Sequence, residues 1–348
     1  MVQNTAGERT VIDFMKSRRW TIFFWLQDLV WKIGRWKSPE LEKFVTEYDP
    51  DVVFTVLSNS VFLNNLILHV HSLTKAKLVL YAWDNNYSLR QFMLSPLRWV
   101  KHFIDRASMR KVAAKADLFY VISQIQKEDY EKSFGKKCVV LTKGADFTEL
   151  PMVKTHQNKP LQLVFTGNIG LNRWRSLKII SDALENINRD GIKAQLRIYT
   201  ATPLTKKIEK ALNRGESSFI MGSVPASKIP EIQNNADMLV HVEALDLKNK
   251  LLVRQSFSTK IVDYLKAARP ILAVGPKDVA SIDHLIRNDC AIVADNKKEL
   301  EEKLRAALAD TSVLNAVVEK AYDCGRKYHN KQDIQNMLVA DLNAVCSK

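Results

Sequence analysis

The feature that most constrains the fold is a repeated alternation of short apolar runs with longer amphipathic segments. The runs predicted to be strands are Val52–Leu57, Leu78–Ala82, Leu118–Ile122, Val139–Leu141, Leu161–Thr166, Leu196–Tyr199, Phe219–Met221, Met238–Val242, Ile271–Val274 and Ala291–Val293. Segments with helical periodicity lie between most of them, for example Leu97–Lys115, Ser176–Arg189 and Glu299–Leu308. Continuous apolar strands that alternate with helices are typical of a parallel sheet covered by helices on both faces.

A polar, proline-bracketed segment, PMVKTHQNKP at residues 151–160, interrupts this alternation, and an apolar strand restarts it at Leu161. Such a segment is typical of a linker. The sequence therefore predicts an α/β protein with two doubly wound, Rossmann-like domains over residues 1–155 and 156–328. Residues 329–348 form a helical segment that we expect to pack back on the first domain.

The charge balance favours an anionic partner. The chain has 52 Lys and Arg against 38 Asp and Glu, a net charge of +14, and the surplus is divided equally between the two halves. This balance suits nucleic acid, acidic lipid or a phosphorylated substrate. Because there is no basic tail, we expect no nucleic-acid partner. The four cysteines lie far apart without metal-ligand spacing, so we expect reduced thiols in a cytoplasmic protein.

The first segment that could carry chemistry is TGNIGLNRWRSL, Thr166 to Leu177. Gly167 and Gly170 follow a strand and allow close approach of the backbone to a phosphate. Arg173 and Arg175 would add charge-assisted contacts near the start of the next helix, which is expected at Ser176. The alternative is a plain strand–helix turn with two solvated arginines.

The second segment is QSFSTKIVDYLKAARPILAVG, which begins at Gln255. Ser258 is predicted to cap a helix that starts at Thr259. Lys260 then lies in the first turn, where a cation opposes the helix dipole, and an anion bound by Ser258, Thr259 and Lys260 would explain this placement. Asp263 lies at i+3 from Lys260 and could accept hydroxyl hydrogen bonds from a ribose or hexose. The alternative is a solvated Lys–Asp pair.

These two segments resemble the nucleotide-binding domain of GT-B fold glycosyltransferases, especially family 4, which acts in bacterial polysaccharide synthesis. The resemblance covers about Leu161 to Val293, and more weakly Pro50 to Leu141. Domains of this fold normally begin with a strand, whereas the first clear strand here begins at Val52, so the resemblance implies that the opening strand–helix units of the first domain are missing or very short. The family has two glutamates separated by seven residues, and QSFSTKIVD keeps that spacing with Gln255 and Asp263. The resemblance implies that Asp263 binds the ribose of a nucleotide sugar and that Gln255 contacts the donor sugar. Glu243, after the preceding strand, is an alternative carboxylate.

The resemblance also assigns other parts of the chain. Backbone near Ser223 and Val224 would meet the nucleobase. In the phosphate segment, Asn168 and Arg175 stand where the family usually has an Arg and a Lys, and Arg173 would compensate. In the first half, LYAWDNNYS resembles the segment that faces the interdomain cleft, so Asp84 and Asn85 are the candidates on the acceptor side; a helix-capping loop is the alternative.

The function that the resemblance implies is transfer of a sugar from a nucleotide diphosphate donor to a glycan or lipid-linked acceptor, without a metal or other cofactor and with retention of configuration. Asp84 and Glu243 are the candidate catalytic residues. Two alternatives remain open: a non-catalytic protein that binds sugar nucleotides, and a sugar-nucleotide epimerase of the same architecture. The pair Asp49 and Asp51 spells the metal motif of another glycosyltransferase fold, but the intervening proline is typical of a turn.

A basic segment suggests an anionic membrane surface as a further partner. Residues Arg90–Lys115 include seven basic residues and one acidic residue. An apolar helical stripe runs through them, formed by Leu97, Val100, Phe103, Ile104 and Ala107. Tryptophans lie upstream, at positions 20, 25, 31 and 36. This combination is typical of peripheral attachment to a bilayer; a solvated face above a core stripe is the alternative.

Overall fold

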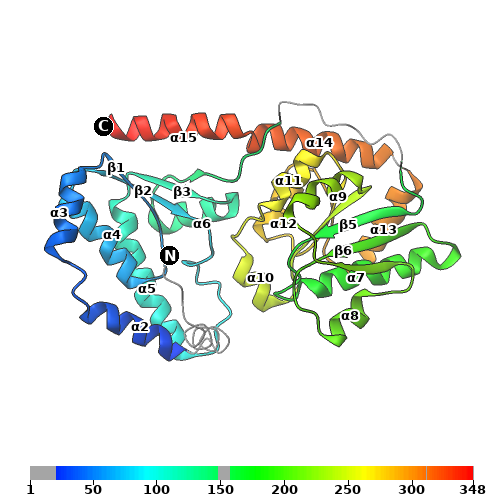
Figure 1. Cartoon of the computed structure of the whole chain (residues 1–348), viewed down its shortest axis with the longest axis horizontal. Coiled ribbons are helices and arrows are strands. Elements are labelled where there is room, and N and C mark those ends of the chain that lie inside the picture. The colour runs from blue at the N-terminus through cyan, green and yellow to red at the C-terminus, as the bar shows by residue number, and fades with distance from the viewer. Residues whose placement is uncertain (1–20, 148–156, 311, 348) are drawn as a thin grey trace.

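Two parallel sheets organise the molecule, one in each half of the chain (Figure 1). The structure is a computed structural model, and it describes residues 21–147, 157–310 and 312–347. The strands of the first sheet are β1 (Val52–Val56), β2 (Lys77–Ala82), β3 (Leu118–Val121) and β4 (Val139–Val140). The strands of the second sheet are β5 (Leu161–Thr166), β6 (Ala194–Tyr199), β7 (Ser218–Gly222), β8 (Met238–Val242), β9 (Ile271–Val274) and β10 (Ile292–Ala294).

In the first sheet, the strands follow one another in the order β1-β2-β3-β4. Its helices are α2 (Thr21–Ile33), α3 (Pro39–Tyr48), α4 (Val61–Leu73), α5 (Pro96–Lys115) and α6 (Gln124–Phe134). The central strands are buried on both faces, with Leu80 and Phe119 at most 1 % exposed. Among residues 21–51, the structure contains helices and no strand before β1. Residues 1–20 and most of the predicted linker lie outside the described residues.

The second sheet has the order β10-β9-β8-β5-β6-β7, so β5 lies beside β8 and the chain runs outward in both directions from this pair. Ligands of such doubly wound sheets bind at the carboxyl ends of the strands where the order reverses. The helices of this half are α7 (Arg173–Ile187), α8 (Lys206–Leu212), α9 (Ile229–Asn235), α10 (Leu247–Val253), α11 (Lys260–Ala267), α12 (Ala280–Arg287), α13 (Lys297–Ala309) and α14 (Ser312–His329).

The chain returns to the first half at its end. Helix α15 (Lys331–Cys346) follows α14 and runs over the side of the molecule that holds the first sheet (Figure 1). The Tyr120 hydroxyl donates to Asp341 Oδ2 over 3.0 Å. The joint between α14 and α15 also contacts the segment after β4, where the Ala145 N–H donates to the His329 carbonyl over 2.8 Å. The two halves are therefore linked by two crossings of the chain that lie side by side.

The predicted α/β architecture with parallel, Rossmann-like sheets is confirmed; the strand order reverses in the second sheet, whereas the described strands of the first sheet follow one another in one direction. Strands β5, β8 and β9 have the predicted bounds, because each is a mostly apolar run in the interior of the sheet. The uncharged stretch after Asp51 forms β1 and α4, and no helix of the described residues is long and apolar enough to cross a membrane. Several other bounds differ from the predicted ones by one or two residues, and α7 begins at Arg173, three residues before the predicted Ser176.

Candidate functional site

The two loops that carry the best candidates follow the two strands at the reversal of the second sheet. Gly167 comes directly after β5 and Glu243 directly after β8. The backbone N–H of Gly167 donates to the Tyr199 carbonyl, and that of Glu243 donates to the Val274 carbonyl, over 2.9 Å in each case. Both residues are therefore fixed to neighbouring strands at the sheet edge where a ligand is expected.

Gly167 lies against the amine of Lys260. Its φ of +150° belongs to the backbone region that favours glycine, and a Cβ at this position would clash with Lys260 Nζ. Lys260 is the first residue of α11, and its Nζ lies 5.7 Å from the centre of the Phe165 ring. Burial lowers the pKa of Lys260, and Arg173 lowers it further, whereas Glu243 and Asp263 oppose the shift. The amine is thus held in a half-buried position directly above a glycine backbone.

Glu243 forms a buried ion pair with Arg173. Its side chain is almost fully buried, and Oε2 accepts from Arg173 Nε over 3.0 Å and lies 2.9 Å from the second guanidinium nitrogen. His241 Nε2 lies 3.5 Å from the other carboxylate oxygen. Burial alone would raise the pKa of Glu243, but His241 and Arg173 outweigh it, so the pKa is lowered and the group stays ionised. The site therefore gathers Arg173, Glu243 and Lys260 around Gly167.

The rest of the predicted phosphate segment takes other roles. Leu171 and Asn172 both have positive φ, which turns the chain sharply into α7 and explains why the helix starts early. The side chain of Asn168 accepts from the Gly170 N–H over 2.6 Å, and the exposed guanidinium of Arg175 lies 5.4 Å from the centre of the Trp174 ring. Arg173, rather than Arg175, is the arginine that joins the charged cluster.

The start of α11 differs from the prediction at Ser258. The residue that caps the helix is Thr259, without a side-chain hydrogen bond, while the Ser258 N–H donates to Ser281 Oγ over 2.8 Å. Asp263 lies one turn after Lys260 and forms an ion pair with Lys143, on the segment between the two halves; both side chains are partly exposed. The prediction of a Ser258 cap is therefore wrong, because this residue is bound to the start of α12.

Ser223 and Val224 lie in the loop after β7, the edge strand of the second sheet. In the sheet order, β6 lies between β7 and β5, and β8 lies on the other side of β5. Ser223 is exposed and Val224 half-buried. Contact of these residues with a nucleobase stays a prediction.

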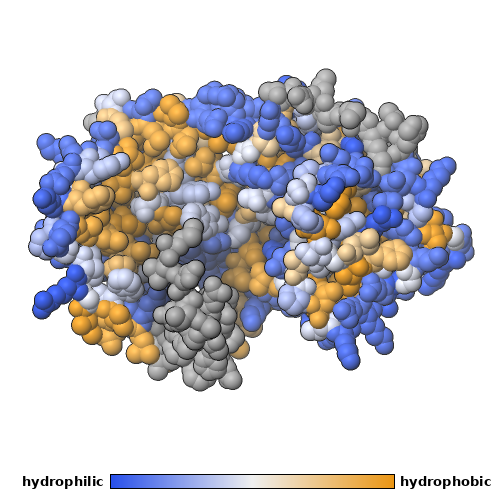
Figure 2. Space-filling model, in the orientation of Figure 1, coloured by the Kyte–Doolittle hydropathy of each residue, from blue (hydrophilic) through white to orange (hydrophobic). Residues whose placement is uncertain are grey.

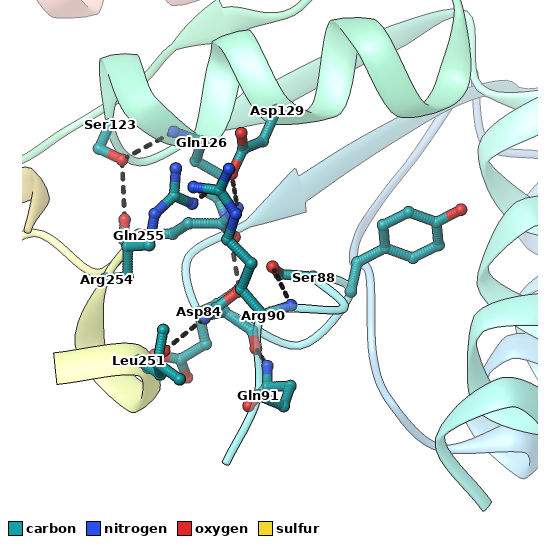
Figure 3. Close-up of polar contacts among 12 residues, drawn as sticks. Asp84, Ser88, Arg90, Gln91, Ser123, Gln126, Asp129, Leu251, Arg254 and Gln255 are labelled. Carbon is teal, nitrogen blue, oxygen red and sulfur yellow. Dashed lines mark hydrogen bonds and ion pairs between the residues drawn. The ribbon is translucent and has the colours of Figure 1, made fainter. Parts of the chain in front are cut away.

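The remaining candidates meet at a polar contact between the two halves, which we call the interdomain seam. It consists of Asp84, Asn85, Ser123 and Asp129 from the first half and Leu251, Arg254, Gln255 and Ser256 from the second (Figure 3). Asp129, on α6, accepts from Arg254 over 2.5 Å and from Gln255 Nε2 over 2.6 Å. The Gln255 carboxamide thus faces the first half.

Asp84 and Asn85 follow β2 and reach the same seam. Asp84 is exposed, and its Oδ1 accepts from Ser256 Oγ over 3.3 Å. Asn85 is buried, and its Nδ2 donates to the Leu251 carbonyl over 2.6 Å. The helix-capping alternative for Asn85 is therefore wrong, because its amide contacts the other half of the chain.

Comparison with known proteins bears on the fold. No family model matches the sequence, and no curated protein matches it significantly. Among solved structures, Anabaena HepE, crystallised with UDP, matches with a TM-score of 0.65 and 14 % identity over 88 % of this chain and 81 % of HepE. Sucrose-phosphate synthase from Thermosynechococcus elongatus matches with a TM-score of 0.61 and 11 % identity over 87 % of this chain and 76 % of its own. The trehalose 6-phosphate synthase of Burkholderia multivorans gives 0.61 and 11 %, over 88 % and 74 %.

These matches cover both halves of the chain. The chain has the GT-B fold, as the sequence predicted. Membership of family 4 stays a prediction.

Sequence reasoning missed the central ion pair of the seam, Asp129 and Arg254, among other seam residues. They lie 125 positions apart in the sequence. Asp129 stands in the charged segment QKEDYEKS, whose pattern is that of a solvated helix face, and Arg254 directly precedes the predicted donor motif. No local signal joins them; only the proximity of Arg254 to Gln255 could have drawn attention to one partner.

Proposed function

We propose that this chain is a glycosyltransferase that moves a sugar from a nucleotide diphosphate donor to an acceptor hydroxyl. The observation that carries the proposal is the cluster of Arg173, Glu243 and Lys260 around Gly167, at the strand reversal of the second sheet. Proteins of the same fold, such as HepE, have been crystallised with UDP and with UDP-glucose. This support concerns the donor; the acceptor, a glycan or lipid-linked glycan, is inferred from the resemblance.

The chemistry follows from the charges. When the bond between the sugar and the diphosphate breaks, negative charge develops on the leaving oxygen, and cations already in place stabilise it. Lys260 supplies an amine beside a bare glycine backbone, and Arg173 supplies a guanidinium fixed by Glu243. Asp263 is proposed to hold the ribose, and Asp84, across the cleft, to face the acceptor. Retention of configuration and independence of metal ions are part of the proposal.

The test uses nucleotides first and sugar donors second. UDP, GDP and ADP are titrated by calorimetry, and the corresponding glucose nucleotides are then incubated in EDTA with and without glycan and polyprenyl-linked acceptors. We expect binding of at least one diphosphate, and turnover only when an acceptor is present. Turnover without acceptor would identify an epimerase, and binding without turnover a non-catalytic protein. Failure to bind any of the three nucleotides would contradict the proposal.

We further propose that the acceptor side of the enzyme attaches to an anionic bilayer. The stripe of α5 is not a core stripe: Leu97, Val100, Phe103 and Ile104 are all at least 40 % exposed. Helix α2 lies beside it, joined through the ion pair of Lys101 with Asp28. Its own exposed apolar residues are Leu26, Leu29, Val30, Trp31 and Ile33. Figure 2 shows hydrophobic surface over the region of α2.

Basic residues surround this apolar surface. Lys32, Arg35 and Lys37 follow one another at the end of α2, Arg98 stands on α5, and all four are exposed. Each cation near an acidic bilayer is worth about 1 kcal/mol. We expect the protein to sediment with vesicles of acidic lipid, less with neutral ones, and Val100→Glu to weaken the binding. Binding to duplex DNA instead of vesicles would show that the basic surface has a different partner.

A further inference from the structure

The interdomain seam has one strong contact, and it is centred on Asp129. The carboxylate of Asp129 accepts from both Arg254 and Gln255, and Figure 3 shows these side chains converging on it from the opposite half. The Arg254 side chain is 9 % exposed and Gln255 is fully buried, whereas the Asp129 side chain is 36 % exposed. Burial would raise the pKa of Asp129, but its two donors, together with the charge of Arg90, lower it, so the carboxylate stays charged. A charged hydrogen bond to buried donors is stronger than one in open solvent, and removal of one charged partner leaves the other uncompensated.

The same seam leaves other polar atoms unpaired. Within the described residues, Gln255 Oε1, Arg254 Nε and Asn85 Oδ1 are buried and have no hydrogen-bond partner. A buried polar atom without a partner costs free energy, so these atoms oppose the closed arrangement. The strong contact at Asp129 therefore stabilises the seam against this cost.

The loop that Asp129 holds is stiffly joined to the charged cluster. The Arg254 carbonyl accepts from the Ala280 N–H over 2.8 Å, and the Ser258 N–H donates to Ser281 Oγ over 2.8 Å, so both ends of the loop are fixed to the start of α12. Lys260 follows two residues after Ser258. The loop that carries Gln255 is therefore anchored to the start of α12, and its second anchor lies directly before the first turn of α11.

We propose that Asp129 is a positioning residue: by holding Arg254 and Gln255 across the cleft, it keeps the loop before Lys260 against the first half and so sets the closed arrangement of the two halves. Its consequence for turnover rests on the proposed glycosyl transfer. The closure itself does not, since it is a property of the chain alone.

The helix that carries Asp129 offers a matched control. The neighbouring Glu128 also forms an ion pair across the halves, with Arg287 on α12 over 3.2 Å. Both of these side chains are about half exposed, in contrast to the Asp129 partners. Exposed pairs contribute little because water and salt screen them. Glu128→Ala therefore removes one interdomain ion pair from the same helix without touching the seam.

The experiment measures the distance between the halves by pulsed electron spin resonance. Labels are placed at Lys111→Cys on α5 and Lys210→Cys on α8, both exposed, with the exposed Cys346 replaced by serine; the other three cysteines are buried. In Asp129→Ala we expect the ratio of closed to open molecules to fall at least about tenfold. Glu128→Ala should keep the wild-type distribution, and Asp129→Glu, which retains the charge, should restore most of the closed population.

UDP is titrated against the same variants. We expect the UDP affinity of Asp129→Ala to stay within about threefold of wild type, because Arg173, Glu243 and Lys260 are unchanged. If acceptor-dependent turnover is found, Asp129→Ala should lower kcat more than it raises KM for the donor. Thermal unfolding confirms that each variant is folded, and Asp129→Asn replaces Asp129→Ala if the latter is not.

Two outcomes would overturn the proposal: a wild-type distance distribution in both Asp129→Ala and Asp129→Asn, or an equal shift in Glu128→Ala. Failure of the wild type to bind any of UDP, GDP and ADP, combined with opening of Asp129→Ala, would contradict the glycosyltransferase function and support the role of Asp129 in closure.

Discussion

The carboxyl ends of the two sheets differ in kind. In the second half, β5 and β8 end beside a charged cluster in which Glu243 pairs with Arg173, and Lys260, which feels both charges, lies against the Gly167 backbone. In the first half, β2 ends in Asp84 and Asn85, whose polar groups contact the other half through hydrogen bonds and carry no ion pair in the described residues. One sheet end concentrates charge, and the other mainly contacts its neighbour.

This difference suggests that the two halves have different roles. A preorganised set of charges costs folding free energy and is expected where charge develops during a reaction. The first half instead presents an apolar, basic-rimmed outer surface on α2 and α5. We therefore infer that the second half binds the donor and stabilises the leaving group. The first half is inferred to bind the acceptor and to attach the protein to the surface where the acceptor lies. The four predictions below test this inference, from the largest expected effect to the smallest.

Removing the buried carboxylate should cost the most stability. Glu243→Gln leaves the Arg173 guanidinium without its charged partner, and we expect the free energy of unfolding at pH 7 to fall by about 3 kcal/mol. Because the folded pKa of Glu243 is lowered, its contribution is present above about pH 4.5 and is lost as the pH falls through the folded value. Urea unfolding at several pH values measures both effects.

The matched control for this variant is Glu231→Gln, which breaks an exposed pair with Lys228. It should change stability by less than about 1 kcal/mol. An equal loss of unfolding free energy in the two variants would mean that the Glu243–Arg173 pair contributes no more than an exposed surface pair. The proposed contrast between the carboxyl ends of the two sheets would then be contradicted.

The joint between the halves should respond to acid. His329 Nε2 lies 3.1 Å from His284 Nε2, and its Nδ1 lies 3.2 Å from the Lys143 carbonyl. Burial, aided by His284, lowers the pKa of His329 to about 4, against the opposing effect of that carbonyl. As the pH falls, His329 is protonated near pH 6.5 in the unfolded chain but only near pH 4 in the folded chain. Stability is therefore lost over this window, by about 3 kcal/mol in total.

His329→Gln cannot titrate, so the slope of stability against pH between 6.5 and 4 should be smaller in this variant than in wild type. Chemical unfolding across that range gives the slopes. Identical slopes would show that His329 is not the group that limits stability where the two halves join.

Replacing the amine beside Gly167 should weaken nucleotide binding. Lys260→Ala removes a charge-assisted contact, and we expect UDP affinity to fall by about 1.5–3 kcal/mol. Lys266→Ala, on the last turn of the same helix and exposed, is the control and should bind as wild type does. Calorimetry measures the affinity. Unchanged UDP affinity in Lys260→Ala would contradict the inference that the second half binds the donor.

The smallest effect is expected where the linker meets the donor site. Lys143→Ala breaks a partly exposed pair with Asp263, so stability should change by less than about 1 kcal/mol. Since the variant frees the carboxylate proposed to hold the ribose, UDP affinity should rise slightly or stay unchanged. A tenfold loss of affinity would show that Lys143 itself contacts the nucleotide. Asp263→Ala should weaken UDP more than its 2′,3′-dideoxy analogue.

The sequence predicted the second half better than the seam, for a physical reason. Buried strands such as β5 and β8 are encoded by local apolar runs, and Gly167, Glu243 and Lys260 stand at fixed offsets from the elements they border. Side-chain partners at the seam depend on tertiary contacts across more than a hundred residues, as with Asp129 and Arg254. The early start of α7 was not predicted, because it follows from left-handed backbone at Leu171 and Asn172. A leucine in the sequence gives no indication of left-handed backbone.

The return of the chain through α15 has a consequence for anyone who wishes to dissect or recombine this protein. A single cut after β4 would leave α15 covalently attached to the half that holds the second sheet. Yet Asp341 of α15 accepts a hydrogen bond from the Tyr120 hydroxyl, which belongs to the first sheet. The first half would then lose a partner, and a chimera joined at that one point would carry a foreign helix against it. The exchangeable unit is discontinuous: two junctions, one near Lys143 and one near Asn330, must be moved together.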